Sequence, residues 1–140
     1  MRVIVFVKAT EDTENGASVS PEAFEAMERF NEELVDAGVL ISAEGLMPSS
    51  TGKRIRYDGV SRTIIDGPFA ETRELVAGFS LWEVKDMDEA IAWAERCPNP
   101  MPGAWEVEIR PLGEMTDFEE GATPETRELR YRLREKPGAA

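Results

Sequence analysis

The stretch DGPFAETRE, residues 66–74, separates two apolar, strand-like segments and decides how the rest of the chain is interpreted. It combines an Asp-Gly-Pro turn with an aromatic ring, Phe69, and four charged side chains. Such a composition predicts a turn, because Gly67 permits unusual backbone angles and Pro68 stiffens the exit. Loops held between rigid elements also carry many binding and catalytic residues. We therefore expect a turn here with a pocket beside it.

The segments on either side of this stretch predict a sheet with two covering helices. Strands are expected at residues 2–8, 39–47, 75–84 and 104–110, a hairpin at 53–58 and 61–65, helices at 21–37 and 87–97, and a loop at 9–19. Asp-Gly at residues 58–59 is the turn signal of the hairpin. Ser20 and Asp86 are expected to cap the two helices, and Gly45 to mark a bulge. The apolar side of the first helix comprises Phe24, Met27, Phe30, Leu34 and Val35.

This order of elements predicts an α+β domain, a ferredoxin-like split βαβ sandwich with helices on one face of an antiparallel sheet. Two helices cover only one face, yet the strands at 2–8 and 75–84 are apolar on both. An uncovered apolar face marks an interface. The simplest cover is a second copy of the chain, a homodimer. The alternative is a monomer whose own hairpin and C-terminal tail cover the face.

The composition limits the classes of protein to which this chain can belong. The chain has 140 residues, 41% of them hydrophobic, and a net charge of −12, which argues against direct nucleic acid binding. No apolar run is long enough for a membrane span. The single cysteine, Cys97, suits a cytoplasmic protein and is expected to be a buried small side chain rather than a nucleophile. With no histidine and no phosphate-binding glycine motif, we expect no metal and no nucleotide cofactor.

Residues 1–115 form the predicted domain, and residues 116–140 form a tail with a possible helix at 124–135. That helix has a narrow apolar stripe, Leu129 and Leu133, surrounded by arginines. Residues 121–140 carry five basic and three acidic side chains, whereas the remainder is strongly acidic. The tail is therefore interpreted as an appendage that is weakly stable or docks on a partner subunit.

Several motifs make the chain resemble the YCII-related, DGPF-motif family. They are Leu46-Met47-Pro48-Ser49, the stretch at 66–74, Ala77-Gly78-Phe79, residues 88–94, Cys97-Pro98 and residues 108–111. The resemblance covers roughly residues 1–115 and implies a ferredoxin-like fold paired into a dimeric α–β barrel, with a pocket near the motif. It also implies small-molecule chemistry in some relatives and a link to alternative sigma factors in others. A His–Asp pair proposed for the broader family is absent here, so only its aspartate maps, onto Asp66.

Asp66 is the candidate catalytic base, because Phe69 and Pro68 would partly desolvate its carboxylate. The alternative is a turn role, in which Asp66 caps its own backbone. The candidate ligand-binding residues are Arg54, Arg56, Phe69, Glu71, Arg73 and Arg110. Arginines clamp anions well, but a charged hairpin edge and surface ion pairs are the plainer interpretation of these side chains. Trp105 is expected to belong to the core, although it could also line a pocket.

Two hypotheses follow for function. The first is a homodimeric, cofactor-free protein that binds or transforms a small polar or aromatic ligand by lyase- or isomerase-like proton transfer. The second is a regulatory or interaction module, linked to an alternative sigma factor, that uses the arginine-rich tail.

Overall fold

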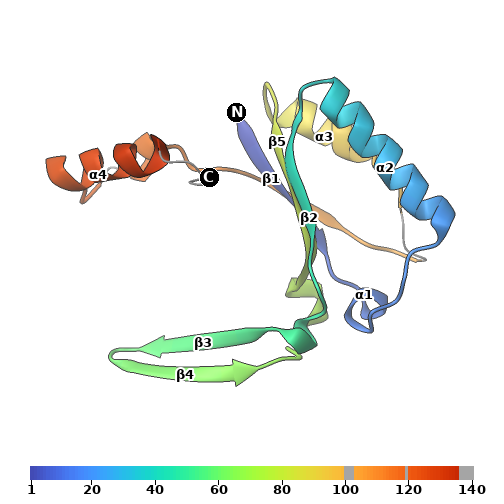
Figure 1. Ribbon diagram of the computed structural model, residues 1–140, viewed down its shortest axis with the longest axis horizontal. Coiled ribbons are helices and arrows are strands. Elements are labelled where there is room, and N and C mark those ends of the chain that lie inside the picture. The colour runs from blue at the N-terminus through green and yellow to red at the C-terminus, as the bar shows by residue number, and fades with distance from the viewer. Residues whose placement is uncertain (100–102, 119, 136–140) are drawn as a thin grey trace.

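The computed structural model describes residues 1–99, 103–118 and 120–135 (Figure 1). Its strands are β1 (Arg2–Lys8), β2 (Leu40–Gly45), β3 (Lys53–Asp58), β4 (Ser61–Asp66), β5 (Val76–Glu83) and β6 (Val107–Pro111). Its α-helices are α1 (Glu11–Glu14), α2 (Pro21–Asp36), α3 (Met87–Glu95) and α4 (Pro124–Glu135), and three 3-10 turns are η1 (Ser49–Thr51), η2 (Thr72–Glu74) and η3 (Met115–Phe118). No helix in the described part of the chain is both long and apolar enough to cross a membrane.

Four strands form the main sheet in the order β2-β5-β1-β6, and every neighbouring pair is antiparallel. This order, with α2 between β1 and β2 and α3 between β5 and β6, is compatible with the predicted ferredoxin-like α+β fold. In the centre, Val3 lies opposite Trp82, and Phe6 lies opposite Phe79. Because side chains alternate along a strand, these two pairs point to opposite faces of the sheet.

The first face of the sheet packs against α2 and α3 (Figure 1). Its core consists of Val3, Val5, Phe30, Leu34, Val39, Trp82, Val84 and Ala90, all buried. The predicted caps are confirmed: the Ser20 hydroxyl accepts from the Ala23 N–H, and the Asp86 carboxylate accepts from the Glu89 N–H. Both helices thus begin where the sequence signals place them.

The second face is open. It carries Ile4, Phe6, Phe79 and Leu81, which are only half-buried. Figure 1 shows that the β3–β4 hairpin and α4 project from the sheet on the side opposite to α2 and α3. Neither folds back to lie against the sheet, so the arrangement does not favour the monomeric alternative in which hairpin and tail cover this face. The open apolar face of the sheet and the two projecting segments, the β3–β4 hairpin and α4, are therefore on the same side of the molecule.

Three local expectations were wrong. Residues 11–14 form a short helix rather than a loop, because Thr10 and Thr13 close a reciprocal capping box. The irregularity in β2 falls between Leu40 and Ser42 and not at Gly45. On α2, Phe24 and Val35 are 59% and 57% exposed. They lie about 100–120° around the helix from the stripe of Phe30 and Leu34 that touches the sheet.

Candidate functional site

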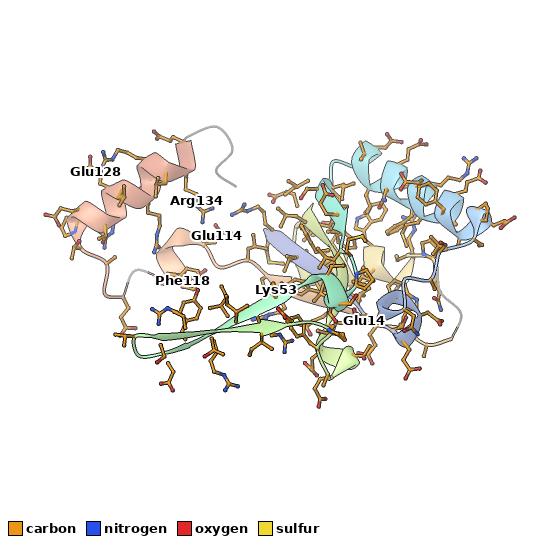
Figure 2. The ribbon with its side chains drawn as sticks, turned by 60° about the horizontal axis from the view of Figure 1, so that its bottom comes forward. Glu14, Lys53, Glu114, Phe118, Glu128 and Arg134 are labelled. Atoms are coloured by element: carbon orange, nitrogen blue, oxygen red, sulfur yellow. The ribbon has the colours of Figure 1, made fainter. Side chains whose placement is uncertain are left out.

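The 66–74 stretch is tied to the η1 turn by its backbone. The Gly67 N–H donates to the Gly52 carbonyl at 3.0 Å, and the Phe69 N–H donates to the Ser49 hydroxyl at 3.1 Å. Ser49 is held in turn by Glu14, whose carboxylate accepts from its backbone N–H at 3.0 Å and from its hydroxyl. Glu14 and Lys53 lie at the end of the hairpin that joins the body (Figure 2). The turn is thereby fixed in place by hydrogen bonds.

Gly67 also explains part of the motif. The Gly67–Pro68 peptide bond is cis, and a side chain at residue 67 would overlap the carbonyl oxygen of Ser49. Only glycine leaves room for this close approach of two backbone segments.

Asp66 lies at the foot of the hairpin and not in a desolvated niche. Its side chain is 72% exposed, and its carboxylate pairs with the Lys53 ammonium at 2.6 Å. The expectation that Phe69 and Pro68 desolvate Asp66 is therefore wrong. The pair joins the first residue of β3 to the last of β4. This contact across the hairpin differs from the expected cap of the Asp66 carboxylate on its own backbone. A catalytic role for Asp66 stays a prediction.

The second half of the motif, residues 71–74, leads away from the hairpin and toward a cleft. Glu71 has φ 64° and ψ 55°, a left-handed conformation that is uncommon for a residue with a side chain. The chain then makes the η2 turn and enters β5. This path brings Glu71, Thr72 and Glu74 to the edge of a cleft of about 800 Å³. The cleft lies beside the predicted turn, and its further lining comes from Lys8, Ala9, Thr10, Glu11, Ala104, Trp105, Glu106 and Glu108.

The cleft is rich in carboxylates. Among the residues whose side chains the structure describes, five glutamates line it, at residues 11, 71, 74, 106 and 108, and Lys8 is the one cation. Lys8 lies 3.9 Å from the Glu108 carboxylate. Among the described side chains, the other four glutamates form no ion pair. A cleft that combines these carboxylates with the half-buried Trp105 ring suits a molecule that combines hydrogen-bond donors or positive charge with an apolar or aromatic part.

A second hollow of about 460 Å³ lies beside η1. Phe69 lines it with Met47, and the guanidinium carbon of Arg54 sits 4.0 Å from the Phe69 ring centroid. In this cation–π contact, the Arg54 guanidinium covers one face of the Phe69 ring. Phe69 and Arg54 are thus brought together, but neither of them lines the carboxylate cleft.

The remaining predicted ligand-binding residues are dispersed. Arg56 is exposed on β3. Arg110 is exposed on β6 opposite Ile4, on the open face of the sheet. The surface ion pairs expected for Glu71 and the candidate arginines are absent among the described side chains. The side chain of Arg73 lies outside the described part of the structure.

Sequence reasoning missed part of the cleft. The sequence predicts a loop for Thr10 and Glu11 and a core position for Trp105, with a pocket position as its alternative, and it gives no site role to Glu106. All four residues line the cleft. One signal was available for the first two, since the spacing of Thr10 and Thr13 permits a reciprocal cap that fixes their segment. Cys97 is half-buried rather than fully buried, and this burial raises the pKa of its thiol.

Residues 1–115 match the YCII-related domain. The chain belongs to the YCII-related domain family. An uncharacterised protein of Rhizobium meliloti is 36% identical over 78 residues, which are 56% of this chain and 63% of that protein. This chain thus spans less than two thirds of that relative. The motif turn and the carboxylate cleft lie within the matched residues of the YCII-related domain, whereas α4 lies beyond them.

Proposed function

We propose that this YCII-related protein binds a small polar or aromatic molecule in the carboxylate cleft and needs no cofactor to do so. The observation that supports this most is the placement of Glu71 and Glu74 by the family motif on a cleft that also contains Trp105. The carboxylates would accept hydrogen bonds from the molecule or balance its positive charge. The indole ring would pack against its apolar part.

The chemistry that suits this cleft is proton transfer of the lyase or isomerase type. A carboxylate removes a proton from carbon, and the electron pair of the broken C–H bond forms a double bond as a leaving group departs or a second carbon is protonated. Glu71 and Glu74 are better placed for this role than Asp66, because they line the cleft whereas Asp66 is held by Lys53. The left-handed backbone at Glu71 is the kind of strain found at functional sites.

Titration with benzylamine, which combines a ring with an ammonium group, tests the cleft through tryptophan fluorescence. We expect a saturable change that disappears in the Trp105→Phe variant and weakens about tenfold or more when Glu71 and Glu74 are both changed to Gln. The Asp66→Asn variant should bind as the unaltered protein does. Glu22→Gln, on the far side of the sheet, is the matched control. Absence of saturable binding, or equal binding by the Glu71/Glu74 double variant, would contradict the proposal.

A homodimer is the assembly we propose for this protein. It is supported by the four half-buried apolar residues on the open face, Ile4, Phe6, Phe79 and Leu81, since exposed apolar patches mark interfaces. A two-fold pair would bury this face on both copies and give the dimeric α–β barrel that the family resemblance implies. Sedimentation should then report twice the chain mass of 15.6 kDa. Phe79→Lys should shift the mass toward a single chain, and a single-chain mass for the unaltered protein would refute the dimer.

A regulatory role is the second candidate, and α4 is the observation that favours it. The helix lies outside the YCII-related match, stands apart from the sheet and exposes Leu129, Tyr131 and Leu133. An exposed apolar stripe flanked by arginines suits docking on an acidic partner. Affinity capture with the full chain and with residues 1–115 distinguishes the candidates, using a purified alternative sigma factor as bait. Retention of the full chain only would support the regulatory role, and retention of neither would remove it.

A further inference from the structure

The β3–β4 hairpin exposes an apolar face. Ile55 lies opposite Ile64, and Tyr57 opposite Arg62, so these four side chains share one face of the ribbon. Ile55, Tyr57 and Ile64 are 51%, 68% and 70% exposed. Every other residue of the two strands is exposed as well, and the strands pair only with each other. A two-stranded ribbon is marginally stable alone, so contact with another protein surface on either face would stabilise this one.

The hairpin is also a local concentration of positive charge. Residues 53–66 contain four basic and two acidic side chains, a balance of +2, which leaves −14 on the rest of a chain whose net charge is −12. Lys53 is paired with Asp66, Arg54 stacks on Phe69, and Arg62 stacks on Tyr57. Arg56, in contrast, has no ion pair or ring contact among the described side chains.

The carboxylate cleft has the complementary requirement. Glu11, Glu71, Glu74 and Glu106 have no cationic partner among the residues that the structure describes. Carboxylates gathered in one cleft repel one another unless a cation is placed among them. The hairpin projects on the side of the open sheet face, from which a second copy would approach (Figure 1). Arg56 lies opposite Thr63, on the other face of the ribbon from Ile55, Tyr57 and Ile64. The cleft lies on the open side of the sheet, because its Glu108 is opposite Phe6. The hairpin with Arg56 and the acidic cleft are therefore both on the side that would meet the second copy.

We propose that the hairpin of each protomer lies across the carboxylate cleft of the other, with Arg56 opposite Glu71 and Glu74. This inference rests on the proposed function, because it completes the same cleft and requires the homodimer. By two-fold symmetry both clefts are closed in the same way. Each cleft then holds a carboxylate base from its own chain and a guanidinium from the partner subunit. The guanidinium stabilises negative charge that develops on the substrate during proton removal.

Charge reversal tests the pairing. Arg56→Glu and Glu74→Arg should each raise the dissociation constant of the dimer about tenfold or more, since each sets like charges against one another. The double variant Arg56→Glu/Glu74→Arg should return it to within about threefold of the unaltered protein, because the pair is restored with opposite polarity. As a control, Glu22→Arg on the outer side of α2 is combined with Arg56→Glu in place of Glu74→Arg. This control pair should not restore the dissociation constant of the dimer. Additive effects in the first double variant would overturn the pairing.

Cross-linking between copies provides a second measurement that does not depend on dimer strength. In a Cys97→Ala background, Arg56→Cys and Glu74→Cys variants are purified separately, mixed and oxidised. A disulfide-linked species at twice the single-chain mass is expected from the mixture, and none from Arg56→Cys mixed with Glu22→Cys. A dimer that gives neither rescue nor cross-link would overturn the hairpin contact while leaving the homodimer in place. A monomer that still binds benzylamine would overturn the dimer and the hairpin contact but not the cleft.

Discussion

The backbone N–H of Phe69 donates a hydrogen bond to the side-chain hydroxyl of Ser49, 20 residues earlier in the chain. Between these residues lies the whole β3–β4 hairpin, so the bond closes the hairpin at its base. The Glu14 carboxylate accepts from the same serine and extends the connection to α1. The DGPF turn thus connects the base of the hairpin, the η1 turn and α1 through hydrogen bonds, and it leads along the chain to Glu71 in the cleft.

Ser49→Ala removes the centre of this connection. We expect the free energy of unfolding to fall by about 1–3 kcal/mol, because the Phe69 N–H and the Glu14 carboxylate both lose a partner. Combining Ser49→Ala with Glu14→Ala should cost less than the sum of the two single changes, since the residues share one network. Denaturation in urea gives the values. The neighbouring Ser50→Ala is the control, and additivity of the two changes would show that no network exists.

Gly67→Ala should destabilise the fold by steric overlap. The new methyl group would meet the carbonyl oxygen of Ser49, and relieving that contact shifts the backbone at a cost of about 1–3 kcal/mol. At Gly45 a methyl group meets nothing within 4 Å, so Gly45→Ala is the matched control and should be neutral or slightly stabilising. Equal unfolding midpoints for the two variants would contradict the close approach at the motif.

The buried stripe of α2 is narrow, and neighbouring residues should respond to truncation very differently. Leu34 is 1% exposed and Val35 is 57% exposed. Leu34→Ala should lower the free energy of unfolding by about 2–5 kcal/mol through lost burial and a residual cavity. Val35→Ala should change it by less than about 0.5 kcal/mol in the single chain. Chemical denaturation of the two variants checks this, and similar losses would mean that α2 packs on a second surface.

Cys97 should react slowly while the protein is folded. Burial raises the pKa of its thiol above the ordinary value of 9.0, and only the thiolate is nucleophilic. Because the native pKa is the higher one, the associated stability is present below pH 9.0 and is lost as pH rises toward the native pKa. Alkylation by iodoacetamide between about pH 7 and pH 10 should be slower for the native protein than for the urea-unfolded chain. Equal rates at every pH would show that the thiol is accessible.

Much of the fold was predictable because its signals are local. The alternation of apolar residues in β1, the Asp-Gly turn of the hairpin, and the caps Ser20 and Asp86 all act within a few residues of where they stand. The exposure of Phe24 depends instead on how far the sheet extends beneath α2, which is a property of packing. Periodicity specifies the apolar side of a helix but not the width of its contact.

The candidate site was harder to predict, because it is assembled from segments that only the folded chain brings together. The motif predicted a pocket nearby, and Glu71 lines a cleft. The pairing of Asp66 with Lys53 across the hairpin, and the placement of Trp105 in the same cleft as Glu74, depend on strand register and on the path after Glu71. Neither is visible in local composition.

The hairpin, whose strands pair with nothing else in the described chain, also offers a reporter of assembly. Its backbone amides rely on one another alone for protection from solvent, so deuterium from heavy water should replace their protons quickly in an isolated chain. Contact with another protein surface would slow that replacement. Deuterium uptake by residues 53–66, followed by mass spectrometry as the protein is diluted, would therefore measure directly how much of it is assembled.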